Sequence, residues 1–468
     1  MPPPPSAASR DETVIRDRGD ACPGALRLHA ADDGYLARVR IPGGMLTPHQ
    51  ASVLGLAADR FGDGHLELTS RGNVQLRGLA ERCGDGLARL LDSAGLLPAP
   101  GHERIRNVVA SATHAVEPWI AELDRLLCAN ARVAALSGRF LFALDDGSGD
   151  VSSLDPDVTV LGERSGTGPA QEYAGALVRL GTTAAGAVRV SAADAPRAAL
   201  LAAEYFLDAA AAAGTGAWRV AELPAEHAPD HTELAARLEA ADIGATPVAD
   251  PAWPWSPPPA PWGGSRPSRH QTLTALVPLG RLSTGQWREL VQVADRSAGP
   301  LRITPWRSVV LRGAPVTRPF DGPARLRSAG LVLDGDSPWR TVTACTGRPG
   351  CAKALADVRA DARALLEAAD GPLPVHWSGC ERRCGHPRGS AWADVVATAD
   401  GYRVGRAPGP APATAPTTAT ESAPAPDPAP APVHVLHGGD LAGAVRAARG
   451  EPAEPAEPRP DTDVADRK

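Results

Sequence analysis

The chain has 468 residues, of which 43% are hydrophobic and 22% are charged, and its formal net charge is −6. This length allows about two to four domains with hydrophobic cores, and the near balance of charge gives no indication of nucleic-acid binding. No run approaches the roughly 18 apolar residues of a membrane span, and the N-terminal sequence MPPPPSAASRDE lacks the apolar core of a signal peptide. We therefore expect a cytoplasmic protein that binds neither nucleic acid nor a membrane.

Ordered structure is predicted to begin near Ala21. Residues 34–42 alternate apolar and basic side chains, as half-buried strands do, and a glycine turn then leads into a helix that ends at Gly62. Residues 65–76 (HLELTSRGNVQL) are predicted to form a second strand region, kinked at Arg71 and Gly72. A short helix is expected at 84–93.

This unit occurs twice. Residues 42–59 align with 278–295 and, after a shift of one residue, 66–78 align with 301–313. Both copies have a glycine turn, Leu followed by Ser or Thr, a helix containing Ala-Asp-Arg, and a strand ending in Leu-Arg-Gly. Such a duplication predicts a pseudo-twofold body with a large cleft between its halves. The copies differ at Arg71, which aligns with Trp306.

Between the copies, helices are predicted at 118–136, 195–213 and 231–241. A turn followed by a strand is predicted at 104–111, and further strands at 140–143, 158–161, 174–180 and 188–190. An acidic hairpin, DDGSGD, is expected between the second and third of these strands. Residues 245–269 are predicted to be a proline-rich connector that Trp253, Trp255 and Trp262 fix to the surface.

Four of the seven cysteines form two pairs, Cys345 with Cys351 and Cys380 with Cys384. Each pair follows a strand-like run, and residues 352–369 between the pairs are predicted to be helical, so a strand, a helix and a strand bring the thiols together. Four thiolates suit an iron–sulfur cluster or a zinc ion, although five residues within the first pair exceed the about two to four usual for zinc. Inert buried thiols are a third interpretation. An odd number of cysteines argues against a disulfide framework.

The duplicated halves, the sequence TSRGNVQ and the cysteine pairs together resemble the nitrite/sulfite reductase superfamily over about residues 20–405. The resemblance implies an α+β fold of pseudo-twofold architecture, with two ferredoxin-like half-domains and two cluster or tetrapyrrole-cleft domains. Within the superfamily, ACTGRPGCAKA and VHWSGCERRCGHP resemble the precorrin-3B synthase family of aerobic cobalamin biosynthesis. That family consists of O2-dependent monooxygenases that hydroxylate precorrin-3A at C20 and close a γ-lactone.

The resemblance also implies cofactors and partners. Cys345, Cys351, Cys380 and Cys384 would hold a [4Fe–4S] cluster, with Cys384 nearest the tetrapyrrole cleft, and a mononuclear non-haem iron is expected in addition. Such an iron needs about two histidines and a carboxylate, and the sequence does not identify them. No G-x-G-x-x-G motif lies between a strand and a helix, so electrons are expected from a separate NAD(P)H-dependent donor. We expect a monomer.

Four histidines lie in or near segments expected at the cleft, and for each of them we expect a structural or solvent-facing role. They are His49, His114, His376 and His386.

Arg71, Arg106 and Arg139 are the candidate ligands for the acetate and propionate arms of the substrate, because a guanidinium matches a carboxylate in bidentate geometry. Arg71 and Arg106 match anion-binding arginines of the superfamily. Arg139 and Leu141, in SGRFLF, stand where the reductases carry lysines, and the only lysines of this chain are Lys353 and Lys468. Weaker candidates are Arg77, Arg307 and Arg348.

Two alternatives stay open. The first is a sirohaem-dependent nitrite or sulfite reductase, which the missing lysines disfavour because six-electron reduction needs many protons. The second is a non-catalytic [4Fe–4S] electron-transfer or redox-sensing protein.

The expected organisation comprises two repeats, two further domains and five connecting or terminal segments. In chain order these are a disordered N-terminus (1–18), the first ferredoxin-like half-domain (19–100), the first cleft domain (101–244), the linker (245–269), the second half-domain (270–335), the cluster domain (336–406), a disordered Ala/Pro linker (407–432), a docking segment (433–450) and a disordered tail (451–468).

Overall fold

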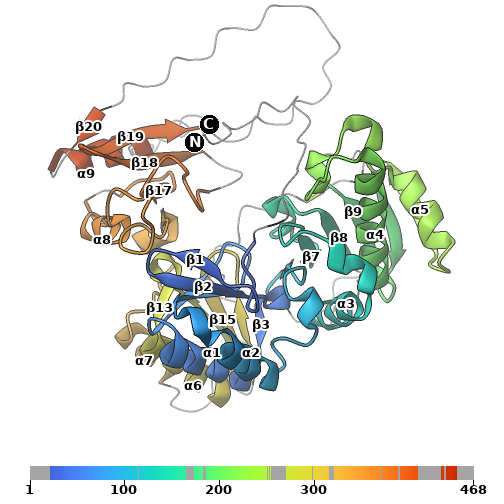
Figure 1. Ribbon diagram of the computed structural model, residues 1–468, viewed down its shortest axis with the longest axis horizontal. Helices are drawn as coiled ribbons and strands as arrows, with labels where there is room; N and C mark the ends of the chain where they lie inside the picture. Colours follow the sequence, from blue (N-terminus) through green and yellow to red (C-terminus); the bar gives the residue numbers. More distant parts are fainter. Residues whose placement is uncertain are drawn as a thin grey trace, which may run out of the picture. The chain divides into compact units, whose positions relative to one another are not determined.

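The structure is a computed structural model, and the chain divides into two compact units, residues 1–337 and 338–468 (Figure 1). The described residues are 20, 22–113, 115–164, 173–182, 186–249, 251, 253–254, 270–297, 299–315, 321–368, 370–387, 391–408, 434–436 and 439–450. The segments expected to be disordered at both termini and most of the expected Ala/Pro linker lie outside these residues, as do His114, Trp255 and Trp262.

The two sequence repeats form two interlocked sheets in the first unit. One sheet has the strand order β1-β2-β5-β4-β13 and the other β12-β15-β14-β3. Strand β3 of the first repeat pairs antiparallel with β14 of the second, and β13 of the second pairs with β4 of the first. Each repeat therefore donates one strand to the sheet of the other. The strands are β1 (His29–Ala31), β2 (Gly34–Val39), β3 (Met45–Leu46), β4 (His65–Leu68), β5 (Val74–Leu79), β12 (His270–Leu276), β13 (Arg281–Ser283), β14 (Leu301–Ile303) and β15 (Ser308–Pro315).

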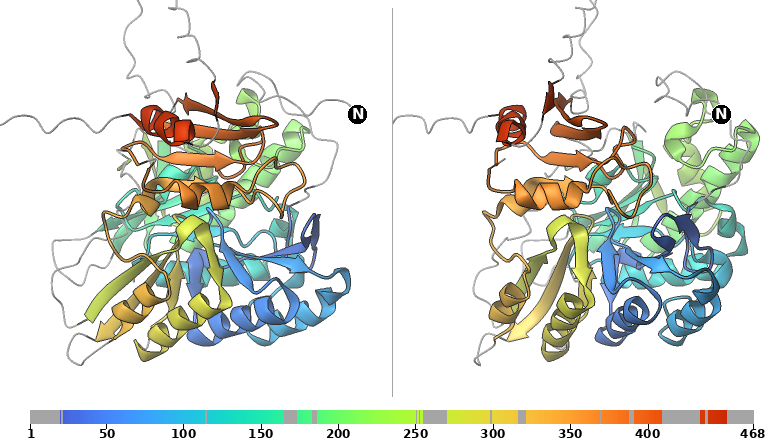
Figure 2. Two further views of the ribbon diagram at one scale, coloured as in Figure 1. Left: turned by 90° about the vertical axis from the view of Figure 1, so that its left-hand side faces the viewer. Right: turned by 60° about the vertical axis from the view of Figure 1, so that its left-hand side comes forward.

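Equivalent helices of the two repeats begin in the same way. Helix α1 (Pro48–Phe61) follows a capping box of Thr47 and Gln50, and α6 (Thr284–Arg296) follows one of Ser283 and Gln286. These caps satisfy the first free backbone N–H groups, so both helix starts are encoded locally. The two helices pack together, and α2 (Gly84–Ser93) and α7 (Gly322–Ser328) lie on the same side of the sheets (Figure 2). The indole of Trp287 donates to the carbonyl of Ala51 at 2.7 Å and links the repeats.

The strand region predicted at 65–76 is in fact a hairpin. Strands β4 and β5 pair antiparallel, and the Thr69 N–H donates to the Asn73 carbonyl at 2.9 Å. Gly72 has a φ of 66°, a conformation that glycine adopts without strain. The expected kink at Arg71 is therefore a tight turn, which projects Arg71 from the end of the sheet.

A six-stranded mixed sheet lies between the repeats in sequence, with the order β11-β10-β9-β8-β7-β6. Helices α3 (Glu117–Ala129), α4 (Ala195–Ala213) and α5 (His231–Glu239) lie on one face of it (Figure 1). The strands are β6 (Val108–Ala110), β7 (Phe142–Asp145), β8 (Val158–Arg164), β9 (Tyr173–Leu180), β10 (Gly186–Ser191) and β11 (Ala245–Ala249).

Two expectations about this sheet were wrong. Strands β7 and β8 are parallel, so the acidic stretch between them is a crossover loop and not a hairpin. Residues 245–249, expected to open the linker, form the edge strand β11 paired with β10. Its proline, Pro247, is tolerated because an edge strand has one side without ladder hydrogen bonds.

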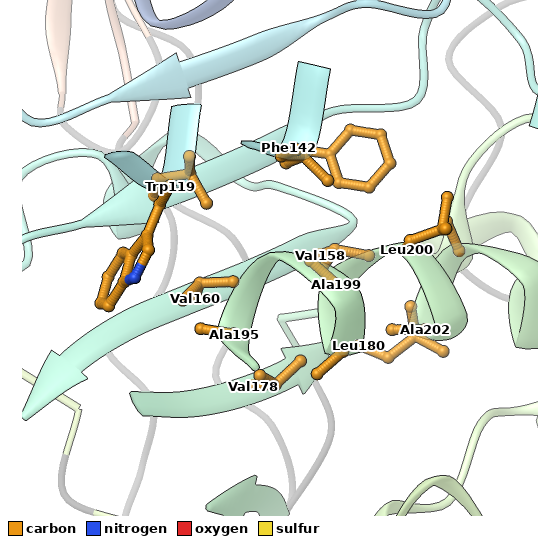
Figure 3. Close-up of a cluster of buried hydrophobic side chains, with 14 of the residues drawn as sticks. Trp119, Phe142, Val158, Val160, Val178, Leu180, Ala195, Ala199, Leu200 and Ala202 are labelled. Atoms are coloured by element: carbon orange, nitrogen blue, oxygen red, sulfur yellow. The ribbon is translucent and has the colours of Figure 1, made fainter. Parts of the chain in front are cut away.

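The core of this domain forms between the sheet and its helices (Figure 3). Alternate side chains of a strand point to opposite faces, and Val158 and Val160 of β8 pack into this core with Val178 of β9. Thr159 and Arg179, at the intervening positions, consequently lie on the opposite face of the sheet.

The second unit is built on a five-stranded sheet of order β16-β17-β18-β19-β20. The helix predicted at 352–369 is much shorter, because Asp357 caps α8 (Val358–Ala364) and the residues before it form a loop. The expected hairpin at 392–406 is confirmed as β18 and β19. The remaining elements are β16 (Val342–Ala344), β17 (Val375–Ser378), β18 (Trp392–Thr398), β19 (Gly401–Ala407), β20 (His434–Leu436) and α9 (Gly439–Arg449).

Candidate functional site

Parallel strands bring the two cysteine pairs to one edge of the sheet in the second unit. Strands β16 and β17 are parallel neighbours, so their carboxyl ends lie side by side. Cys345 directly follows β16, and Cys380 is the second residue after β17. The Cys345 N–H continues the ladder by donating to the Trp377 carbonyl at 3.0 Å. The predicted convergence of the pairs thus results from strand pairing.

The loop that carries Cys351 is fastened to the loop that carries Cys380. The Leu355 N–H donates to the Gly379 carbonyl at 2.8 Å, and the Ala354 N–H donates to the Cys351 carbonyl at 2.9 Å. A Cβ at position 379 would lie 2.6 Å from the Cβ of Ala354. This close approach requires glycine, because a side chain would push the two loops apart.

Neighbouring groups shift the pKa values of Cys345 and Cys384. Burial raises the pKa of Cys345, N–H groups of Gly379 and Gly347 oppose this, and the nearby Cys380 raises it further. The Gly379 N–H lies 3.1 Å from the Cys345 sulfur. The pKa of Cys384, whose residue is exposed, is raised by partial desolvation of its sulfur and by the charges of the other three cysteines. Such a group of thiolates is stabilised by binding positively charged iron or zinc.

Among the described residues, the cysteine sulfurs are not gathered as closely as the ligands of one zinc ion would be. Zinc–sulfur bonds of about 2.3 Å in a tetrahedron would hold sulfur atoms roughly 3.8 Å apart. Among the residues that the structure describes, the one set of three candidate ligands lying within 4.8 Å of one another is Asp145, Asp146 and Asp150, and it contains no cysteine. A cluster with one cysteine per iron suits four more widely separated thiols.

Two of the three candidate arginines lie together in the first unit. The Arg71 guanidinium donates to the Arg139 carbonyl at 3.1 Å. The Arg139 guanidinium lies 4.9 Å from the ring centre of Trp218, in cation–π geometry. The β4–β5 turn and the segment before β7 therefore present their cations at one place.

Two further arginines of this cluster were missed. Arg38 and Arg40 were interpreted as basic positions of an alternating strand, but Arg40 is only 3% exposed. Burial and the charges of Arg38 and Arg71 lower the pKa of Arg40 to about 9. The buried Nε of Arg38 has no hydrogen-bond partner among the described residues. We call Arg38, Arg40, Arg71 and Arg139 the arginine cluster.

The third candidate, Arg106, is occupied within the protein. Its Nε and Nη2 donate to the two carboxylate oxygens of Asp124 on α3, at 2.6 and 2.7 Å, and its Nη1 donates to the Leu96 carbonyl at 3.1 Å. This bidentate pair connects α3 to the strand region before β6, so a carboxylate of the chain already occupies the Arg106 guanidinium. Among the weaker candidates, Arg77 pairs bidentately with Asp33.

The candidate histidines do not complete an iron site within the described part of the chain. His376 is fully buried on β17, with Nδ1 2.8 Å from the Thr343 hydroxyl. His386 stacks on Trp392 with ring centres 4.9 Å apart, and His49 is exposed on α1. None of them belongs to a set of three ligands within metal-binding distance.

No described helix is both long and apolar enough to span a bilayer.

The fold and these residue sets define a protein of nitrite/sulfite reductase-like architecture. The family model "Nitrite/Sulfite reductase ferredoxin-like half domain" matches residues 29–93 and 265–318, which are the two repeats. The solved structure of Mycobacterium tuberculosis NirA superposes with a TM-score of 0.64 at 19% identity, over 84% of this chain and 78% of that one. The predicted fold class is thereby confirmed.

Two kinds of enzyme are similar to this chain over most of its length. The chain is 26% identical over 408 residues to precorrin-3B synthase of a Sinorhizobium species. The aligned region covers 83% of this chain and 83% of the relative. It is also 26% identical over 398 residues to ferredoxin–nitrite reductase of Synechococcus elongatus, over 76% of this chain and 74% of the relative. The suspected superfamily resemblance is confirmed, and these relatives, which are enzymes, support an oxidoreductase-type enzyme.

Proposed function

We propose that this protein is a precorrin-3B synthase, an O2-dependent monooxygenase that hydroxylates precorrin-3A at C20 and forms the γ-lactone. The observation that carries the proposal is a cation cluster made of arginines alone. The guanidinium groups of Arg38, Arg71 and Arg139 suit a substrate with several carboxylate arms, because a guanidinium offers a planar fork to a carboxylate.

The same observation disfavours nitrite or sulfite reduction. Arginine stays protonated in proteins and is therefore a poor proton donor. Leu141, at the expected position of a reductase lysine, is 2% exposed and packs against Val109 and Ala143. This part of the chain binds anions without supplying the protons that a six-electron reduction consumes.

In this proposal, Arg71, Arg139 and Arg38 bind acid arms of the tetrapyrrole. Arg40 is buried, donates to the carbonyls of Arg104 and Gly138, and adds positive charge to the site. Cys345, Cys351, Cys380 and Cys384 hold a [4Fe–4S] cluster, which supplies single electrons. Hydroxylation consumes O2, two electrons and two protons, and one oxygen atom leaves as water. We expect a separate reductase to deliver the electrons and the reaction to take place in the cytoplasm.

The test is turnover by the full chain after anaerobic cluster reconstitution. With precorrin-3A, an electron donor and 18O2, the product should gain one labelled oxygen atom in the mass spectrum. Arg71→Gln should raise KM more than it lowers kcat, whereas Arg125→Gln, in an exposed ion pair on α3, should change neither. Sirohaem absorption bands with consumption of nitrite or sulfite would instead support the reductase. An intact cluster without any turnover would support the electron carrier.

A further inference from the structure

A second basic site lies on the six-stranded sheet, on the face opposite α3, α4 and α5. Thr159 of β8 and Arg179 of β9 are directly opposed in the antiparallel ladder. Both belong to the set of alternate residues that points away from the helix-covered core. Side chains directly opposed on neighbouring strands lie in contact range, so the hydroxyl and the guanidinium project from one spot.

Both side chains have polar atoms without partners. Thr159 is 1% exposed and Arg179 is 9% exposed. The Thr159 Oγ1 and the Arg179 Nε are buried, and neither forms a hydrogen bond in the part of the chain that the structure describes. A buried charge without a counterion is costly, and burial lowers the pKa of Arg179 to about 10.

Buried arginines of this unit have partners within the chain: Arg40 donates to the carbonyls of Arg104 and Gly138, and three others form ion pairs. Arg106 is paired with Asp124, Arg77 with Asp33, and Arg302 with Glu117. Each of these pairs compensates the buried guanidinium with a carboxylate of the chain. No described carboxylate forms such an ion pair with Arg179, so its geometry points to a carboxylate that comes from a ligand.

Trp253 shapes the site. The Arg179 guanidinium lies 3.9 Å from the ring centre of Trp253, which covers one face of the cation. A carboxylate binds a guanidinium in the plane of its N–H groups. Trp253 also packs against an apolar patch of Leu161, Leu177 and Ala187, which suits the methylene groups of an acid arm.

We propose that Thr159, Arg179 and Trp253 bind one carboxylate arm of the substrate, as a subsite separate from the arginine cluster. This inference rests on the proposed function, because the ligand is an aliphatic carboxylate carried by the tetrapyrrole. Two strand spacings, about 10 Å across the sheet, separate β7 from β9. Arg139 lies three residues before β7, so a macrocycle with several acid arms can contact both sites.

Binding to uroporphyrin III, which carries acetate and propionate arms, tests the assignment in the full cluster-loaded chain. Fluorescence titration should show that Arg179→Gln weakens binding about tenfold to hundredfold, as expected for a lost charge-assisted hydrogen bond. Thr159→Val should weaken it less. Arg189→Gln is the matched control on the neighbouring strand, because Arg189 is exposed and already paired with Glu163, and it should bind as the wild type does.

Stability of the ligand-free protein separates a ligand site from a structural cation–π contact. If Arg179 awaits a ligand, Arg179→Met should unfold at the same or a higher urea concentration than the wild type. Unfolding at a clearly lower concentration would overturn the assignment, as would uroporphyrin binding by Arg179→Gln that equals that of Arg189→Gln. In that second case the proposed function itself would stand.

The opposite case, in which the wild type binds no tetrapyrrole, would count against the proposed function. Urea unfolding in the presence of acetate then tests whether the site at Arg179 binds a carboxylate. If acetate raises the unfolding midpoint of the wild type but not of Arg179→Gln, the site takes a small free carboxylate. An equal response of the two proteins would refute a carboxylate site at Arg179.

Discussion

Asp150→Asn should make the protein more stable at neutral pH, although the substitution removes a hydrogen-bonded carboxylate. Asp150 is 6% exposed in the loop between β7 and β8. Burial raises its pKa from 3.8 to about 6, and the charges of Asp145 and Asp146 contribute in the same direction. The Ser111 hydroxyl, which donates to Asp150 at 2.5 Å, offsets this only in part.

The direction in which stability changes with pH follows from proton binding. Between about pH 4 and pH 6 the folded protein keeps a proton on Asp150 that the unfolded chain has released. The free energy of unfolding therefore falls as the pH rises through this window and stays lowered above it. A shift of about two units at 1.36 kcal/mol per unit corresponds to about 3 kcal/mol.

An asparagine at position 150 can keep the hydrogen bonds that the Asp150 carboxylate accepts. The Ser111 hydroxyl and the Val151 N–H both donate to the same carboxylate oxygen of Asp150, and an asparagine carbonyl can accept both. We expect Asp150→Asn to gain about 1–3 kcal/mol near pH 7 and to lose this advantage near pH 4.

The measurement is urea unfolding at several pH values between about 4 and 8. Asp336→Asn, which removes an exposed carboxylate of the first unit, shows the effect of net charge alone. The reasoning is refuted if the two variants give parallel curves, or if Asp150→Asn is less stable than the wild type at neutral pH.

Three further predictions concern packing. Asp124→Ala should lower the free energy of unfolding by about 3–5 kcal/mol in a urea titration, because it leaves Arg106 buried without its carboxylate. Glu122→Ala, which breaks an exposed pair on the same helix, is the control and should cost less than about 1 kcal/mol. Trp287→Ala should cost about 3–5 kcal/mol by opening a cavity between α1 and α6, and calorimetry showing no loss would contradict the interlocked repeats. Gly379→Ala should reduce iron and sulfide content after reconstitution while the first unit keeps its melting transition, and full cluster content would contradict the close loop packing.

Local signals allowed much of the fold to be predicted. The capping boxes at Thr47 and Ser283 act within three residues, and the duplication that contains them was visible in the sequence. The cysteine pairs were found for a similar reason, because each lies directly after its strand. Whether they hold a [4Fe–4S] cluster stays a prediction.

Pairing between distant segments could not be read in this way. The parallel arrangement of β7 and β8 depends on a crossover, and β11 is a strand because β10 offers it an edge. Residues 245–249 have the composition of a linker, and hydrogen bonds to a strand more than fifty residues earlier override that tendency.

The sequence by itself determined that this chain carries a duplicated α+β body, four cysteines suited to a cluster, and cations that are nearly all arginine. Only the tertiary structure decided which arginines are available to a ligand. Arg106 and Arg179 are both buried, yet α3 brings Asp124 to the first, whereas the described chain brings Trp253 and no carboxylate to the second. The role of a buried charge depends on the counterion that folding places beside it, and that neighbour comes from a distant part of the chain.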